Sequence, residues 1–185
     1  MKMRCSWVNM KNETYIHYHD EEWGKPLHDD QKLYELLILE SFQAGLSWEC
    51  VLNKRENFRK AFDGFDIDKV AAYDDEKQQV LKENSGIIRN RLKIKAAVRN
   101  SQVFKKIQAE FGSFDAYIWS FTDGKVIDEP FTIRTTSPLS DQISKDLKKR
   151  GMTFVGSTII YSYLQAMGII YGHGEDCWCR MEDNQ

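Results

Sequence analysis

A single acidic residue stands on what is otherwise the apolar face of a predicted helix. In and just before the stretch "ELLILESFQAGLSW", Glu40 shares its helical face with Leu33, Leu36, Leu37 and Ala44. A carboxylate in such a place is costly to bury unless something binds it. The partner is either an arginine of the same chain or a positively charged ligand that enters from outside.

Aromatic residues cluster in the sequence around this carboxylate. Four fall between residues 5 and 23, and a fifth follows Glu40 by eight residues: Trp7, Tyr15, Tyr18, Trp23 and Trp48. Stacked aromatic rings beside one carboxylate suit a flat, cationic guest with an N–H group to donate, such as a purine alkylated on its ring. The alternative is a small aromatic core that covers the first helices.

Cysteine and histidine residues lie near both ends of the chain. The spacings C-x13-H and H-x3-C bring two thiolates and two imidazoles, a complete tetrahedral set for zinc, from Cys5, His19, His173 and Cys177. Such a metal would fasten the two terminal segments, which fray unless they are tied down. His17 and Cys179 are alternative ligands, and four unrelated loop residues are the other interpretation. Because four protein ligands leave no position for water, we expect any zinc to be structural.

Two basic runs, 89–99 and 145–150, are candidate anion-binding surfaces, although each is also typical of a solvated helix face. The second run leads into a Gly-x-x-x-x-Gly turn between Gly151 and Gly156, followed by an apolar helix that opens at Ser157. Glycine permits positive φ and close backbone approach, and the free N–H groups of a helix N-terminus favour phosphate. The pattern predicts a helical hairpin, and the preceding "KKR" favours a phosphodiester backbone as its ligand.

The elements that must position these residues are almost entirely helical. Hydrophobic periodicity and capping residues predict helices over 31–45, 49–62, 66–73, 74–84, 89–111, 114–121, 139–150 and 157–167. Asp29 or Asp30 suits the first N-cap and Ser47 the second, Gly64 is expected to close the second helix, and Gly86 and Gly112 suit C-caps. Residues 122–138 break the period and predict a loop that can form a short β-ribbon. The fold class is therefore all-α.

Composition places the chain among ordinary globular proteins, with 185 residues, 42% hydrophobic, 29% charged and a formal net charge of −2. The global charge gives no hint of nucleic acid, so any anion-binding surface must be local. No apolar run is long enough to span a membrane and the N-terminus has no signal-peptide core. We therefore expect a cytoplasmic protein with no membrane partner. We also expect a monomer.

Taken together, these features resemble the 3-methyladenine DNA glycosylase I family of the helix-hairpin-helix glycosylase superfamily. The matching stretches run in order along nearly the whole chain and leave 122–138 without a clear family pattern. They are "RCSWV", "YHDEEWGKPLHD", "LLILESFQAGLSWECVLNKRENFRKAF", "GIIRNRLKIKAAVRN", "ISKDLKKRG", "FVGSTIIYSYLQAMG" and "HGEDCW".

The resemblance implies one glycosylase unit over 1–185, made of two packed helical lobes, with the hairpin at about 139–168. A structural zinc would join the terminal segments, about 1–24 and 169–180, through Cys5, His19, His173 and Cys177, which decides against His17 and Cys179. It implies a base pocket of Trp7, Tyr15, Trp23 and Trp48, with Glu40 and Tyr18 in the catalytic roles. On the DNA side, Leu46 would fill the gap left by the extruded nucleotide, while the hairpin between Gly151 and Gly156, with Lys149 and Arg150, would grip the backbone.

The implied reaction is hydrolytic release of N3-methyladenine from double-stranded alkylated DNA, with the free base and an abasic site as products. Because the methylated base is cationic, it leaves as a neutral molecule and needs no protonation. The enzyme must extract the nucleotide from the stack, hold it, and let water take the sugar. Glu40 would accept the exocyclic N–H and attract the cation, and Tyr18 would add a hydrogen bond to the ring edge.

Two positions depart from related glycosylases. Asp176 stands twenty residues after Gly156, where other superfamily members carry a catalytic aspartate, but it falls between two proposed zinc ligands and is not assigned catalysis. Thr153 occupies a position where a basic residue is expected, and the hairpin has no lyase lysine, so we expect a monofunctional enzyme. The rival functions are a DNA-binding module without chemistry, a zinc hydrolase of small molecules, and a glycosylase with a different base range.

Overall fold

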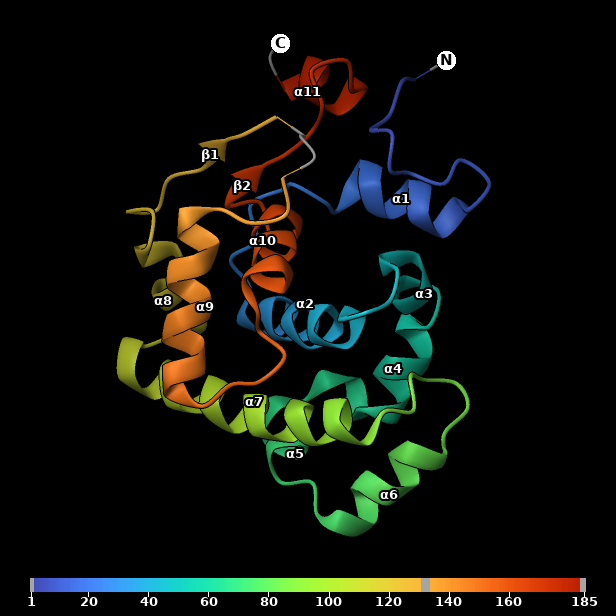
Figure 1. Cartoon of the computed structure of the whole chain (residues 1–185), viewed down its shortest axis with the longest axis vertical. Coiled ribbons are helices and arrows are strands. Elements are labelled where there is room, and N and C mark those ends of the chain that lie inside the picture. The colour runs from blue at the N-terminus through green and yellow to red at the C-terminus, as the bar shows by residue number, and fades with distance from the viewer. Residues whose placement is uncertain (1, 131–133, 184–185) are drawn as a thin grey trace.

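The computed structural model describes residues 2–130 and 134–183, and its regular elements are helices with two short strands (Figure 1). The helices are α1 (Glu13–Glu21), α2 (Asp30–Gln43), α3 (Trp48–Leu52), α4 (Arg55–Ala61), α5 (Ile67–Ala71), α6 (Asp75–Glu83), α7 (Arg91–Phe111), α8 (Phe114–Ser120), α9 (Pro138–Arg150), α10 (Ser157–Ala166) and α11 (Trp178–Asp183). The strands are β1 (Ile127–Asp128) and β2 (Ile170–Tyr171), and a 3-10 turn, η1, spans Asp63–Phe65. The predicted all-α class is confirmed. None of the described helices is both long and apolar enough to cross a membrane.

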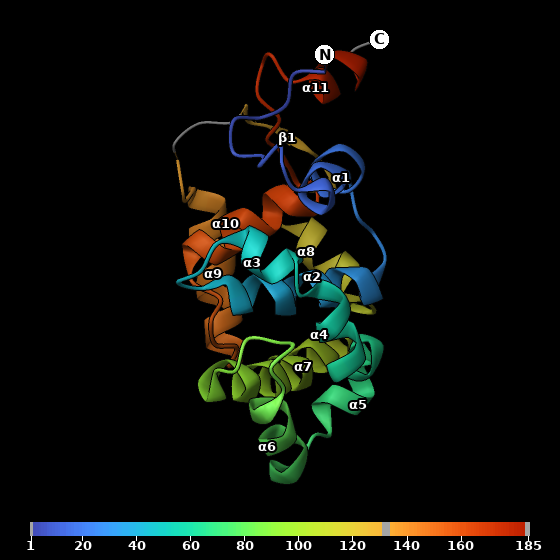
Figure 2. The same ribbon diagram turned by 90° about the vertical axis from the view of Figure 1, so that its right-hand side faces the viewer.

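Helix α2 crosses the middle of the molecule and packs against α7, α10, α3 and α8 (Figures 1 and 2). Its central residues are buried on every side, which explains why its sequence is apolar almost throughout. Asp29, one of the two aspartates predicted as the N-cap, caps the helix by accepting a hydrogen bond from the Lys32 N–H. Asp30 instead accepts the N–H groups of Phe114 and Asp115 and so ties α2 to the start of α8.

The helix predicted over 49–62 is wrong, because the chain forms α3 and α4 with a break at Asn53. The Asn53 side chain accepts a hydrogen bond from Asn12, a partner 41 residues away that the local pattern does not reveal. Helix α4 ends at Phe62, before Gly64, which lies with φ +68° inside η1. The predicted cap at Gly86 is also wrong, since α6 ends at Asn84, whose side chain accepts the Gly86 N–H.

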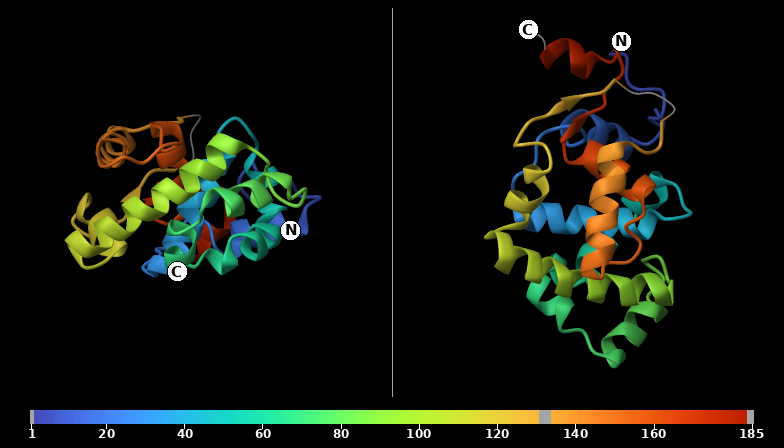
Figure 3. Two further views of the ribbon diagram at one scale, coloured as in Figure 1. Left: turned by 90° about the horizontal axis from the view of Figure 1, so that it is seen from below. Right: turned by 60° about the vertical axis from the view of Figure 1, so that its left-hand side comes forward.

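Among the described residues of 122–138, the predicted ribbon does not form by local pairing. Strand β1 instead pairs in parallel with β2, with Ile127 opposite Ile170, so its partner lies far along the chain. Residues 131–133 of this segment lie outside the described residues. The pairing brings the segment beside the C-terminal stretch that follows α10 (Figure 3, right).

Helices α1 and α11 were not predicted, and both belong to the terminal segments. Helix α1 is capped by Asn12, which accepts the Tyr15 N–H, and it buries Tyr15, Tyr18 and His19 on one face. Figures 1 and 2 show the N-terminal segment and α11 together at one end of the molecule. A backbone hydrogen bond from Trp178 to Met3 joins them.

Candidate functional site

Glu40 is buried in α2 with 3% of its surface exposed, and it has no basic partner among the described residues. Its Oε2 atom accepts no hydrogen bond there. Burial in this nonpolar environment raises the pKa of Glu40 from 4.5 to about 8. Of the two interpretations of this residue, pairing with an internal arginine is therefore ruled out for the described chain.

A cavity of about 150 Å³ opens beside this carboxylate. Cavities of this size hold one small ring molecule. All six residues assigned to the base site line it, together with three that the sequence did not indicate: Trp7, Tyr15, Tyr18, Trp23, Glu40 and Trp48, and in addition Gln43, Ser162 and Gln165. Gln43 lies three residues after Glu40 on the same helical face, which is a usable signal. The two α10 residues come from a distant segment, and nothing local marks them.

The walls of this cavity come from helices α1, α2, α3 and α10 and from the turns before and after α1. The turn before α1 carries Trp7, α1 carries Tyr15 and Tyr18, and α3 begins with Trp48 after the Ser47 cap. The Asn12 amide at the start of α1 donates to Glu49 on α3 at 2.7 Å, which holds these two walls together. Helices α2 and α10, which pack against each other, supply the remaining wall of the cavity.

The aromatic rings that line the cavity form two contacting groups. The Trp7 ring lies 5.3 Å from Tyr15 and 4.9 Å from Trp23, and the Tyr18 ring lies 5.5 Å from Trp48. Burial, and then the nearby Glu40 charge, raise the pKa of Tyr18 well above its usual value, so its hydroxyl stays protonated. The buried Trp48 Nε1–H has no acceptor in the described chain. Among the residues that line the cavity, Glu40 Oε2 and Trp48 Nε1 are thus an acceptor and a donor without a hydrogen-bond partner.

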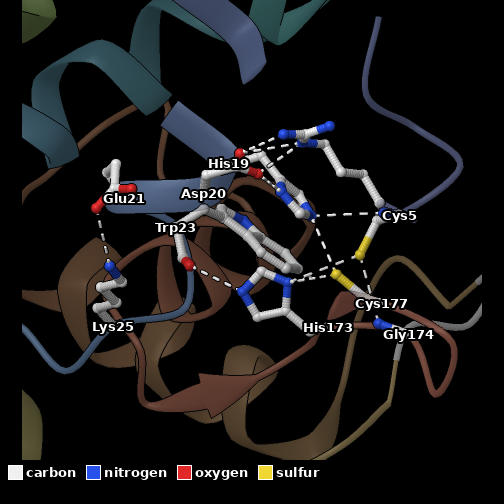
Figure 4. Close-up of polar contacts among 10 residues, drawn as sticks. Cys5, His19, Asp20, Glu21, Trp23, Lys25, His173, Gly174 and Cys177 are labelled. Atoms are coloured by element: carbon white, nitrogen blue, oxygen red, sulfur yellow. Dashed lines mark hydrogen bonds and ion pairs between the residues drawn. The ribbon is translucent and has the colours of Figure 1, made fainter. Parts of the chain in front are cut away.

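The four sequence-predicted metal ligands meet in one buried cluster (Figure 4). Cys177 Sγ lies 3.5 Å from both His19 Nε2 and His173 Nδ1, and Cys5 Sγ lies 3.8 Å from His173 Nδ1. A tetrahedral zinc with its usual bond lengths separates sulfur from nitrogen by about 3.5 Å. The donor set and its spacing therefore fit a metal ion. Burial raises the pKa of the Cys5 thiol to about 12, which disfavours the thiolate form. A bound cation would offset this free-energy cost of ionisation, because it stabilises the thiolate.

The outer nitrogen of each imidazole is also fixed. His19 Nδ1 lies 2.8 Å from Asp20, which Arg4 holds with a two-pronged ion pair, and His173 Nε2 donates to the Trp23 carbonyl at 3.1 Å. Such second contacts orient histidine ligands in metal sites. Of the two alternative ligands, His17 is exposed, while Cys179 is buried in a second possible group, with Asp20, that shares His19 with the first.

The cluster is continuous with the wall of the cavity. The Trp23 ring lies 4.8 Å from the His173 ring and 4.9 Å from the Trp7 ring. The cluster near the chain ends therefore also helps to position Trp23 and, through it, Trp7 in the cavity wall.

The turn between α9 and α10 is tightly built. Gly151 adopts φ +104° and Phe154 adopts φ +55°, a conformation that a bulky residue rarely takes. Gly156, by contrast, has a negative φ and serves as the N-cap of α10, which begins at Ser157 as predicted. Lys149 is exposed, whereas Arg150 is held by Glu110 and Asp146.

Leu46 lies at the tip of the turn between α2 and α3 with 41% of its surface exposed, next to Gly45 at φ +78°. Leu46 does not line the cavity itself, but it lies two residues before Trp48, which does. Asp176 is exposed in the loop between His173 and Cys177 and does not line the cavity.

Comparison with known proteins agrees with this geometry. The family model described as "Methyladenine glycosylase" matches residues 7–181. A DNA-3-methyladenine glycosylase of Haemophilus influenzae is 43% identical over 97% of this chain and 99% of its own length. A crystal structure of 3-methyladenine DNA glycosylase I is 44% identical, with a TM-score of 0.92, and the match covers 96% of this chain and 99% of that one.

A second solved structure is a tyrosine-to-phenylalanine variant of 3-methyladenine DNA glycosylase I in complex with 3-methyladenine. It is 36% identical, with a TM-score of 0.89 over 92% of this chain and 94% of that one. Both the sequence match and the fold match extend over almost the entire chain, so the chain belongs to the methyladenine glycosylase family.

Proposed function

We propose that this chain is a DNA glycosylase that flips cationic N3-methyladenine out of duplex DNA and hydrolyses its glycosidic bond. The observation that carries the proposal is the unpartnered Glu40 carboxylate in the wall of an aromatic cavity that is large enough for one small ring molecule. The 3-methyladenine bound to a solved relative supports the same class of guest. A DNA-binding module that reads only the backbone would not need such a cavity.

The chemistry follows from the cation in the substrate. Glu40, protonated in the empty cavity near neutral pH, releases its proton to water as the positive base enters, because a nearby cation favours the carboxylate form. The carboxylate then accepts the exocyclic N–H, Tyr18 donates to the ring edge, and Trp48 stacks on the base. Neutral adenine presents the same amino group without the charge, so the site favours the methylated base.

Leu46 enters the gap that the flipped nucleotide leaves, and this offsets part of the few kcal/mol that unstacking costs. The α9–α10 pair acts as a helix-hairpin-helix that holds the DNA backbone through the turn between Gly151 and Gly156 and through the exposed Lys149. Arg150 already has two carboxylate partners, so we assign it to the stability of this hairpin rather than to phosphate binding.

The four-ligand cluster binds one structural zinc ion, which supplies no chemistry to the reaction and keeps Trp7 and Trp23 in place. Such a site, with four protein ligands and no position for water, argues against a zinc hydrolase. The enzyme acts as a monomer, and its two helical lobes form one unit over the length of the chain.

Incubation of the purified protein with methylated duplex DNA, followed by chromatography of the released bases, tests this function. We expect free 3-methyladenine, no cleaved strand, and no covalent adduct after borohydride reduction, because the reaction uses water and has no lyase step. Intact DNA with no released base would refute glycosylase activity. A trapped adduct would refute the monofunctional mechanism.

A further inference from the structure

Helix α7 contacts both of the turns that the proposed function assigns to DNA. Its Lys93 side chain reaches the turn after α2, and its Asn100 side chain reaches the turn between α9 and α10. The two residues are seven positions apart, which places them on the same helical face about 10 Å apart along the axis. Figure 1 shows α7 running below α2 and past the α9–α10 turn.

Lys93 completes the C-terminal end of α2. Its ammonium donates to the carbonyls of Phe42 at 2.7 Å and Ala44 at 2.5 Å, while the Leu46 N–H donates to the Gln43 carbonyl at 2.7 Å. Helix α2 has no basic residue in its own last turn, so Lys93 supplies from another helix the positive charge that a helix C-terminus favours. Lys93 is 7% exposed, so its ammonium group serves as an internal hydrogen-bond donor and not as a surface charge.

Asn100 holds the hairpin turn in a similar way. Its fully buried amide accepts the N–H of Thr153 and donates to the carbonyl of the same residue, both at 2.9 Å. The next residue is Phe154, the residue with the unfavourable positive φ, and Ser144 fixes the Val155 carbonyl beyond it at 2.7 Å. Such backbone strain persists only where the surroundings hold it.

We propose that Lys93 and Asn100 are positioning residues through which α7 holds the Leu46 turn and the hairpin turn in one fixed frame, so that nucleotide extrusion from duplex DNA depends on both. This inference rests on the proposed function. Neither residue lines the base cavity. Their hydrogen bonds therefore affect extrusion of the nucleotide and leave binding of the base itself unchanged. Lys93 thus differs from the residues that touch the base.

The variants Lys93→Met and Asn100→Leu keep side-chain length or size and remove these hydrogen bonds. We expect each to lower kcat on duplex N3-methyladenine about 10- to 100-fold, since small misplacements far from the reacting atoms have effects of this order. Affinity for free 3-methyladenine, followed by tryptophan fluorescence, should stay within about 2-fold of wild type because the cavity is intact. Ser101→Ala is the matched control, because its hydroxyl bonds Ala97 and Tyr34 and touches neither turn.

The double variant Lys93→Met/Leu46→Ala decides whether Lys93 acts through the wedge. If it does, the double variant is no slower than Leu46→Ala by more than about 2-fold, because coupled residues are not additive. Multiplied effects, unchanged kcat in the single variants, or a loss of free-base affinity equal to the loss of kcat would each overturn the inference. An inactive wild type would instead refute the proposed function, so the two failures are distinguishable.

Discussion

The Glu40→Gln variant is expected to lose about 100-fold or more in kcat/KM on duplex N3-methyladenine, which is the size of effect seen when one preorganised electrostatic partner is removed from an active site. The amide has nearly the same shape but cannot become negative when the cationic base enters. Selectivity for the methylated base over neutral adenine should fall with it. Excision rates on matched duplexes measure both effects.

Asp176→Asn is the matched control for this substitution, since it also turns an acid into an amide, at an exposed position outside the cavity. We expect it to retain wild-type excision and its metal. Equal excision by Glu40→Gln and wild type would remove Glu40 from the mechanism. An inactive Asp176→Asn enzyme that keeps its metal would transfer the acid role to that residue.

Thermal stability measured as a function of pH distinguishes a folded but inactive Glu40→Gln variant from an unfolded one. The folded chain holds the Glu40 proton up to about pH 8, whereas the unfolded chain releases it near 4.5. A raised carboxyl pKa therefore costs stability increasingly as pH rises from about 4.5 to 8, and the cost is constant above that range. Relative to wild type, the glutamine variant should gain thermal stability between pH 5 and pH 8.5.

Removal of the zinc ion that we propose for the four-residue cluster is expected to lower the unfolding midpoint by about 10 °C or more. Structural zinc contributes several kcal/mol at least, and each kcal/mol is worth about 2–4 °C in a chain of this size. The Cys5→Ser variant should show the same loss, together with loss of zinc by elemental analysis. The fluorescence response to free 3-methyladenine should weaken as well, because Trp23 packs on His173.

Cys50→Ser provides the control for the metal site, since Cys50 is a free, half-buried thiol that is not part of the cluster. It should keep one zinc per chain and the wild-type midpoint. Retention of zinc by Cys5→Ser at full occupancy would mean that the four residues do not form the metal site.

Features with a local cause could be predicted from the sequence, and features with a distant cause could not. The burial of Glu40 follows from a 3.6-residue period within one helix, and the hairpin helices follow from their own capping residues. The Asn53 side chain, at the break between α3 and α4, accepts a hydrogen bond from a residue 41 positions away. The candidate metal cluster joins Cys5 and Cys177, which lie 172 positions apart (177 − 5), and spacing alone left His17 and Cys179 open as ligands until the family resemblance decided against them.

Lys93 shows this limit most clearly. In the sequence it belongs to a basic run, 89–99, that is typical of a solvated helix face, and Arg89, Arg91 and Lys95 are indeed exposed. Lys93 is buried because the end of α2 presents two carbonyls that need a donor, and this is visible only once α2 and α7 are packed together. The cavity residues Ser162 and Gln165 escaped prediction for the same reason.

A carbon-13 NMR titration of the Glu40 side-chain carboxyl in the DNA-free protein tests the central claim most directly. An acid kept in a nonpolar cavity until its cationic partner arrives must titrate far above its usual range, and we expect a pKa of about 8. A value near 4.5 would show a solvated or already paired carboxylate and would contradict the account.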